Sequence, residues 1–173
     1  FIGSAEDSLI GTMVLVPQIV DAVDLPVIAA GGIMDGRGLA GALALGASAV
    51  AMGTAFLAAP EAGTHPLHKE ALGKTDDTGT SLTRAVTGRH ARGLRNRYFT
   101  EMAPHAAEMP AYPISNALTM PMRGAAAAKG NTDLMVMWAG QGARMATGRP
   151  AAQIVTDTVA EAENVFANMQ GSK

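Results

Sequence analysis

The clearest hydrophobic pattern along the chain lies between residues 25 and 54. Residues 25–30 form an apolar run that ends at the adjacent glycines Gly31 and Gly32. Such a run predicts a short strand buried on both faces of a parallel sheet. A second apolar run, residues 48–52, predicts another strand. Between them, the helical spacing of Leu39, Ala40, Leu43, Ala44 and Leu45 predicts a helix, and Gly46 stands where helices commonly have a C-terminal glycine.

This order of elements places two glycine-containing loops at one edge of the predicted sheet. Strand, helix and strand fit one βαβ unit, whose right-handed crossover makes the strands parallel. The carboxyl ends of parallel strands, where ligands bind in α/β folds, then carry Gly31-Gly32 and Gly53-Thr54 side by side. Their backbone N–H groups, with the positive end of the helix that the first loop opens, suit a phosphate dianion.

Other interpretations of these glycines compete with a phosphate site. A glycine pair after a strand is commonly no more than a βα turn, although two such loops at one edge favour a ligand. The dinucleotide fingerprint G-x-G-x-x-G would need glycine where Ile33 stands, and the chain contains no G-x-x-x-x-G-K-[ST] phosphate loop. Rossmann and P-loop nucleotide sites are therefore disfavoured.

A helix is also predicted before this unit, over residues 14–23. Pro17 falls in its first turn, and its apolar residues make a face typical of a barrel-wall helix. These residues are Leu15, Ile19, Val20 and Val23.

After residue 60 the pattern becomes less regular. A helix is expected near residues 66–72, then a loop over residues 75–79 and a strand or arm over residues 80–99. Pro104, Pro110, Pro113 and Pro121 predict irregular chain with short helices. Better helices are expected over residues 122–129 and 150–169, the last with Pro150 at its first position. Its predicted apolar face comprises Ile154, Val155, Val159, Ala162, Phe166 and Met169.

Composition excludes several classes of protein. The 173 residues are 48% hydrophobic and 16% charged with a net charge of −2, which is typical of a globular domain and leaves no basic excess for nucleic acid. No apolar run approaches the ~20 residues that span a membrane, so we expect a cytoplasmic protein. The absence of cysteine excludes disulfides, thiolate metal ligands and a thiol nucleophile.

Two histidines stand at a spacing that could serve a metal. His65 and His68 are three residues apart, which places both on one face of a helix. No nearby carboxylate or third histidine completes a ligand set, so a solvated or locally hydrogen-bonded pair is favoured over a metal site.

Five arginines gather within fourteen residues, enough to clamp an anionic substrate. Salt bridges within the chain, or between copies of a homo-oligomer, are the favoured interpretation. The five are Arg84, Arg89, Arg92, Arg95 and Arg97. Trp138 offers an indole that can stack and Gln141 an amide that can hydrogen-bond, but a single tryptophan in an apolar stretch is more often part of the core.

Several segments of this chain carry a resemblance to a known family. They are LPVIAAGGIMDGRGLAGALALGASAVAMGTAFLAAPE, LTRAVTGRHARGLRNRYF, YPISNAL and WAGQGA. Together they resemble the C-terminal part of nitronate monooxygenase, formerly called 2-nitropropane dioxygenase, over almost all of the chain. The glycine pair and the Met-Gly-Thr segment are shared with flavin-dependent enoyl-ACP reductases, whereas the arginine-rich, YPISNAL and WAGQ segments are closer to nitronate monooxygenase.

The resemblance implies an α/β fold, the C-terminal portion of a TIM (β/α)8 barrel with a helical C-terminal extension. Residues 1–60 would be the last βα units of a flavin-binding barrel, and residues 61–173 a mostly helical and irregular region. A complete barrel takes about 250 residues, so we expect this chain to be a fragment. The implied FMN phosphate contacts are Gly31, Gly32, Ala51, Met52, Gly53 and Thr54.

Two positions depart from the family pattern. The family usually has glutamine where this chain has Ala51, a change that preserves a backbone contact but removes a side-chain amide. The family's catalytic base is a histidine in a Gly-Gly-His-x-Gly motif, and aligning its last glycine on Gly3 places Phe1 at the histidine position. We therefore expect no catalytic residue in this chain.

The function that the resemblance implies is FMN-dependent oxidation of alkyl nitronates or nitroalkanes by dioxygen, with release of a carbonyl compound and nitrite. We expect that activity of the intact parent enzyme, and expect this chain alone to be inactive. The alternatives are an FMN-dependent enoyl-ACP reductase and a non-catalytic fragment that binds phosphate or flavin.

Overall fold

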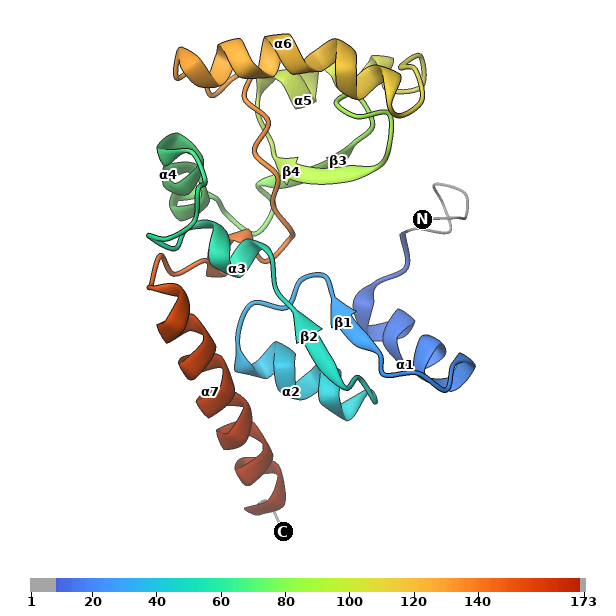
Figure 1. Ribbon diagram of the computed structural model, residues 1–173, viewed down its shortest axis with the longest axis vertical. Coiled ribbons are helices and arrows are strands. Elements are labelled where there is room, and N and C mark those ends of the chain that lie inside the picture. The colour runs from blue at the N-terminus through green and yellow to red at the C-terminus, as the bar shows by residue number, and fades with distance from the viewer. Residues whose placement is uncertain (1–8, 172–173) are drawn as a thin grey trace. The chain divides into compact units, whose positions relative to one another are not determined.

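The computed structural model describes residues 9–171, which divide into two compact units (Figure 1). Unit 1 combines the chain up to Ala62 with the chain from Met145 onward, and unit 2 is Gly63–Arg144. Helix α7, which the sequence groups with residues 61–173, thus belongs to unit 1. Within the described residues, no helix combines the length and apolarity needed to cross a membrane.

Unit 1 contains the predicted βαβ unit. Its strands β1 (Ile28–Ala30) and β2 (Ala49–Ala51) pair in parallel, with Ala30 opposite Ala51, and helix α2 (Gly36–Ala44) connects them. Gly46 follows α2 with φ +93°, and its amide donates to the Leu43 carbonyl, so the predicted C-terminal glycine is confirmed. The unit is completed by α1 (Thr12–Ala22), α3 (Thr54–Leu57) and α7 (Ala151–Gly171).

Burial in unit 1 is more one-sided than the sequence predicts. β1 buries only Ala29, while the Ile28 side chain on the opposite face is 63% exposed. The prediction of a strand buried on both faces was therefore wrong for the described residues, because α1 and α2 cover only one face of this two-stranded sheet. Val16, Ala29, Ile33, Ala42 and Ala47 form the buried cluster between these elements.

Helix α1 also differs from its prediction. It begins at Thr12, so Pro17 lies inside the helix rather than in its first turn. Val16 is buried and Val20 packs against the core cluster, but Leu15, Ile19 and Val23 of the predicted face are about 40% exposed.

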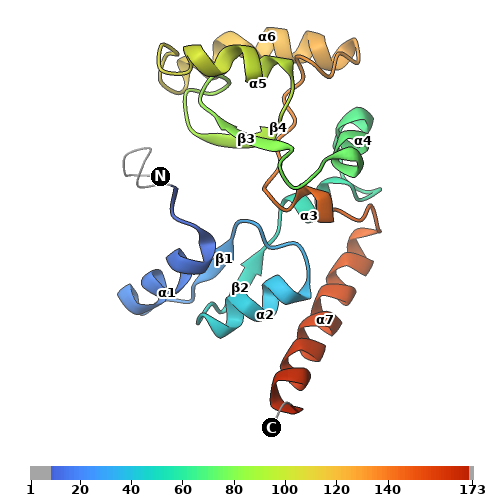
Figure 2. The ribbon, with the colours of Figure 1, turned by 180° about the vertical axis from the view of Figure 1, so that it is seen from behind.

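Helix α7 lies along α2 (Figures 1 and 2). Its buried stripe is Ile154, Thr158 and Ala162, spaced four residues apart, and not the wider face that the sequence predicts. Val155, Val159 and Met169 are exposed. The helix begins at Ala151, one residue after Pro150, whose carbonyl accepts the first helical hydrogen bond from the Ile154 amide.

Unit 2 is built on a β-hairpin within the segment predicted as strand or arm. Strands β3 (Thr80–Thr83) and β4 (Ala91–Leu94) pair antiparallel, and the segment through Trp138 extends the sheet beside β4. Helix α4 (Pro66–Lys74) confirms the helix expected near residues 66–72. The remaining helices are α5 (Arg97–Met102) and α6 (Ile114–Ala128), with single 3-10 turns at Ala103–His105 (η2) and Ala143–Met145 (η3).

Helix α6 corrects the prediction of irregular chain up to residue 121. It starts at Ile114 and continues through Pro121, which is exposed. The Asn116 carbonyl, one turn before the proline, accepts hydrogen bonds from the side chains of Thr119 and Arg123. The helix continues through a residue that has no N–H to donate to the Ala117 carbonyl, four residues earlier. Its buried face packs over the core of unit 2, formed by Ala85, Val86, Tyr98 and Phe99.

Candidate functional site

The two glycine loops of unit 1 follow the carboxyl ends of the adjacent parallel strands β1 and β2, and so lie at the same edge of the sheet. Gly31 directly follows β1, and Met52 and Gly53 directly follow β2. Because Ala30 is opposite Ala51 and paired strands lie about 4.8 Å apart, the register places Gly31-Gly32 next to Met52-Gly53.

The backbone at these glycines has open space above it. Gly31 and Gly32 have φ values of +114° and +73°, which other residues rarely adopt. A Cβ placed at Gly32 or Gly53 would meet no atom within 4 Å. Within residues 9–171, the N–H groups of Gly32 and Gly53 donate to no protein acceptor. The two amides are therefore available to an oxygen ligand, and these residues fit a phosphate.

The other three predicted contacts have different surroundings. Ala51 ends β2 and is exposed. The Met52 side chain packs against the core cluster, which leaves only its backbone for a ligand. Thr54 is the first residue of α3, after Gly53 at the N-cap.

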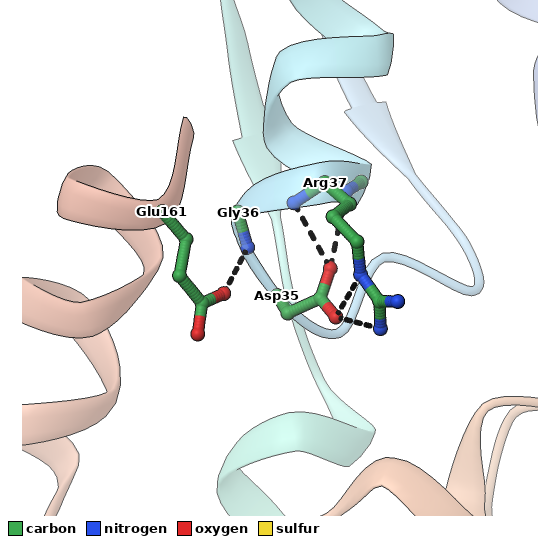
Figure 3. Close-up of polar contacts among 5 residues, drawn as sticks. Asp35, Gly36, Arg37 and Glu161 are labelled. Carbon is green, nitrogen blue, oxygen red and sulfur yellow. Dashed lines mark hydrogen bonds and ion pairs between the residues drawn. The ribbon is translucent and has the colours of Figure 1, made fainter. Parts of the chain in front are cut away.

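The N-terminus of α2 is not available to an anion, contrary to the sequence expectation (Figure 3). The helix begins at Gly36, four residues after the glycine pair, and Asp35 caps it. The Asp35 carboxylate accepts hydrogen bonds from the Arg37 and Gly38 amides at 3.0 and 3.2 Å. Two carboxylates occupy this end of the helix, because Glu161 of α7 accepts from the Gly36 amide at 3.0 Å.

The Asp35 carboxylate is held in its charged form. Burial opposes ionisation, but the hydrogen bond from the Arg37 side chain, the Gly38 and Arg37 amides and the charge of Arg37 outweigh burial and hold the pKa of Asp35 below its ordinary value. The negative charge beside α2 therefore persists at neutral pH.

Side-chain cations contribute little to an anion site in unit 1. Its sequence holds three Lys and Arg residues against nine Asp and Glu residues. Arg37 is ion-paired with Asp35, and Arg149 is ion-paired with Asp157. An anion at the strand ends would thus rely on backbone amides.

A largely apolar cavity of about 330 Å³ opens beside the glycine pair. It lies between α1 and α2, and its lining includes Gly31, Gly32, Met13, Val16 and Leu45. The Thr12 hydroxyl, the one side-chain donor among the lining residues, is directed to the Gly31 carbonyl at 2.9 Å. A Cβ at Gly31 would lie 2.8 Å from that hydroxyl, and the φ of +114° at this position strains any other residue, so both features favour glycine there.

The histidine pair of unit 2 does not gather a metal site. His65 caps α4, its Nδ1 accepting from the Leu67 amide, and His68 is buried and hydrogen-bonded to the Trp138 backbone. No group of three or more potential metal ligands occurs among the described residues. The local interpretation of this pair is therefore favoured by its contacts.

Four of the five clustered arginines have partners within unit 2. Arg97 pairs with Glu101, and Arg89 lies over the Tyr112 ring at 4.4 Å. The Arg92 guanidinium donates to the Thr80 hydroxyl, and the Arg84 guanidinium donates to the Gly88 carbonyl.

Trp138 and Gln141 have different surroundings. The Trp138 ring packs edge-on against Phe99 in the core of unit 2, with 6.2 Å between the ring centres. Gln141 is exposed.

The proposed alignment at Phe1 and Gly3 lies outside the described residues, so no structural statement applies to it. The four histidines of the chain all fall in unit 2.

Comparison with known proteins identifies a consistent set of relatives. The nitronate monooxygenase family profile matches residues 2–161. A probable nitronate monooxygenase from Staphylococcus aureus strain Newman is 45% identical over 158 residues, which cover 91% of this chain and 44% of that protein; the protein from strain JH9 gives the same figures. The chain therefore spans less than half the length of these curated relatives.

Solved structures agree with the sequence relatives. A nitroalkane oxidase from Streptomyces ansochromogenes is 46% identical with a TM-score of 0.89, over 96% of this chain and 48% of that one. FabK from Thermotoga maritima is 34% identical with a TM-score of 0.80, over 95% of this chain and 52% of that one.

Proposed function

Because this chain belongs to the nitronate monooxygenase family, we propose that it forms the phosphate-binding part of an FMN-dependent enzyme that oxidises alkyl nitronates to a carbonyl compound and nitrite. In this proposal it corresponds to the last βα units of a TIM barrel. The FMN phosphate is held by the backbone of Gly31, Gly32, Ala51, Met52, Gly53 and Thr54.

The observation that carries the proposal is the juxtaposition of two unpaired glycine amides at neighbouring strand ends. Gly32 and Gly53 each have open space above the backbone, and the register of β1 and β2 brings their loops together. Phosphate oxygens are strong acceptors, and convergent backbone N–H groups bind them without a side-chain charge. This suits an acidic unit whose two described arginines are already paired.

The chain's contribution in this proposal is to bind and orient. FMN, when bound, would supply the oxidation-reduction chemistry. Gly31 and Gly32 allow the backbone to approach the phosphate, and the carboxylates at α2 keep that anion away from the helix end. An alkyl nitronate has already lost its α-proton, so its oxidation requires no base from this unit.

A second candidate function is the FMN-dependent reduction of enoyl thioesters on an acyl carrier protein. The likeness to FabK, at a TM-score of 0.80, favours it. Both candidates use the same phosphate loops, and a non-catalytic flavin-binding role would also use them. The likeness to the nitroalkane oxidase, at 46% identity, supports nitronate oxidation as the first candidate.

Flavin titration of loop variants tests the phosphate assignment. Gly32→Val and Gly53→Val would each project a side chain into the open space above the loop, and Gly53 has a negative φ that tolerates substitution. We expect each change to weaken FMN binding about tenfold or more, the cost of losing hydrogen bonds to a charged group. Binding is measured by quenching of flavin fluorescence, with riboflavin, which lacks the phosphate, in parallel.

The matched control is Gly124→Ala. Gly124 also has open space around it but lies within α6 of unit 2, so this variant should bind FMN as the parent does. Parent-like FMN affinity in Gly53→Val would contradict the assignment, as would equal losses of FMN and riboflavin binding.

A further inference from the structure

Helix α7 packs very closely against Gly36, the first residue of α2. A Cβ at Gly36 would lie 2.3 Å from the Glu161 Cβ and 2.5 Å from the Ala162 amide nitrogen, so the two helices meet where only glycine fits. The Gly36 amide donates to the Glu161 carboxylate at 3.0 Å, which joins residues 125 positions apart (Figure 3).

The residues between the glycine pair and this contact are anchored at both ends. Ile33 is buried in the core cluster of unit 1, and Met34 is buried beside α7, where it shares a small cavity with Ile154, Thr158 and Glu161. Asp35 then caps α2 through the Arg37 and Gly38 amides. Three consecutive amides at this helix end are thus held by carboxylates from two separate elements.

We infer that Glu161 is a positioning residue for the phosphate loop, acting through the Gly36 amide to fix the path of Gly31-Gly32. This inference rests on the proposed function. Gly32 has a positive φ and an amide without a protein partner, so its direction depends on how the following residues are held. A loop fixed before the ligand arrives loses less conformational freedom on binding.

The inference is tested with three variants of the full chain. Glu161→Ala removes the acceptor of the Gly36 amide, and Glu161→Gln keeps an oxygen that can accept the same hydrogen bond. Glu163→Ala is the control, because Glu163 is exposed on the same helix. Each is examined by amide hydrogen exchange of the segment 31–34 and by its affinities for FMN and riboflavin.

We expect Glu161→Ala to speed exchange in residues 31–34 and to lower the preference for FMN over riboflavin about three- to tenfold, the range for one hydrogen bond. Glu161→Gln and Glu163→Ala should match the parent in both measurements. A general loss of structure would lower the affinities for FMN and riboflavin together. Parent-like behaviour of Glu161→Gln would show that the hydrogen-bond acceptor, and not the negative charge, is what matters at this position.

Unchanged exchange of residues 31–34 in Glu161→Ala would overturn the inference, and so would an unchanged FMN preference. If the parent itself does not prefer FMN to riboflavin, the proposed phosphate site fails and the positioning role fails with it. Faster exchange in Glu161→Ala would then remain as a structural effect, which distinguishes the two failures.

Discussion

The His68 imidazole links α4 to the segment through Trp138 in unit 2. Its ring is buried and hydrogen-bonds to the Trp138 backbone, while Nε2 is buried without a partner among the described residues. Burial lowers the pKa of His68, the Trp138 hydrogen bond partly offsets this, and the charge of His65 lowers it further, leaving it below its ordinary value of 6.5. Folding therefore favours the neutral ring.

This environment predicts a loss of stability in mild acid. The pKa of His68 is lower in the folded chain than in the unfolded chain, so on acidification the unfolded chain takes up the proton first. The contribution of the neutral His68 ring to folding stability is therefore present above about pH 6.5 and is lost as the pH falls below that value. His68→Asn keeps a donor for the Trp138 carbonyl but does not titrate, so its melting temperature should fall less between pH 7.5 and 5.5. His105→Asn, which changes an exposed histidine, is the control and should behave as the parent does. An equal fall of melting temperature in the parent and in His68→Asn would refute the prediction.

Single residues differ in how far sequence reveals their role. The glycines after both strands stand out because an apolar run ends at each of them, and Asp35 stands just before a helix, where a capping residue is expected. Glu161 has no such local signal, since its partner Gly36 lies 125 residues earlier. Long-range partners of this kind depend on tertiary packing and do not follow from periodicity.

At the scale of elements, the contact between α2 and α7 is the most sensitive to volume. Gly36→Ala would place a methyl group against the Glu161 Cβ and the α7 backbone, so α7 must shift. We expect a loss of about 1–3 kcal/mol in the free energy of unfolding, the usual cost of overpacking. Urea denaturation measures this loss, with Gly41→Ala as the control in the same helix; equal stability of Gly36→Ala and the parent would show that the contact is looser than described.

The elements themselves were predicted unevenly. The parallel βαβ unit and α7 follow from apolar spacing, because each packs one face against a neighbour. Helix α4 was expected around residues 66–72 without such a pattern. The first half of α6 does not follow from apolar spacing, since Pro113 and Pro121 indicate broken chain, and the helix instead continues past Pro121. In this half of the helix Ser115 and Thr119 are buried, so tertiary packing outweighs local propensity.

For the molecule as a whole, charge is distributed unequally between the two units. Unit 2 has ten Lys and Arg residues against six Asp and Glu residues, whereas unit 1 has three against nine. The candidate phosphate loops therefore lie in the acidic unit. Because both arginines in the described part of that unit are ion-paired, a dianion there would rely chiefly on oriented backbone amides, and those amides are the central claim of the proposal.

Backbone amide NMR of the ¹⁵N-labelled chain tests this claim most directly. On titration with FMN, the Gly32 and Gly53 amide resonances should shift and saturate together with one affinity, because both N–H groups donate to the phosphate. Riboflavin should leave these two resonances in place, and the amide of Gly124, in α6 of unit 2, should not respond to either flavin. Saturable FMN binding that leaves Gly32 and Gly53 unshifted, or the same shifts with riboflavin, would contradict the account.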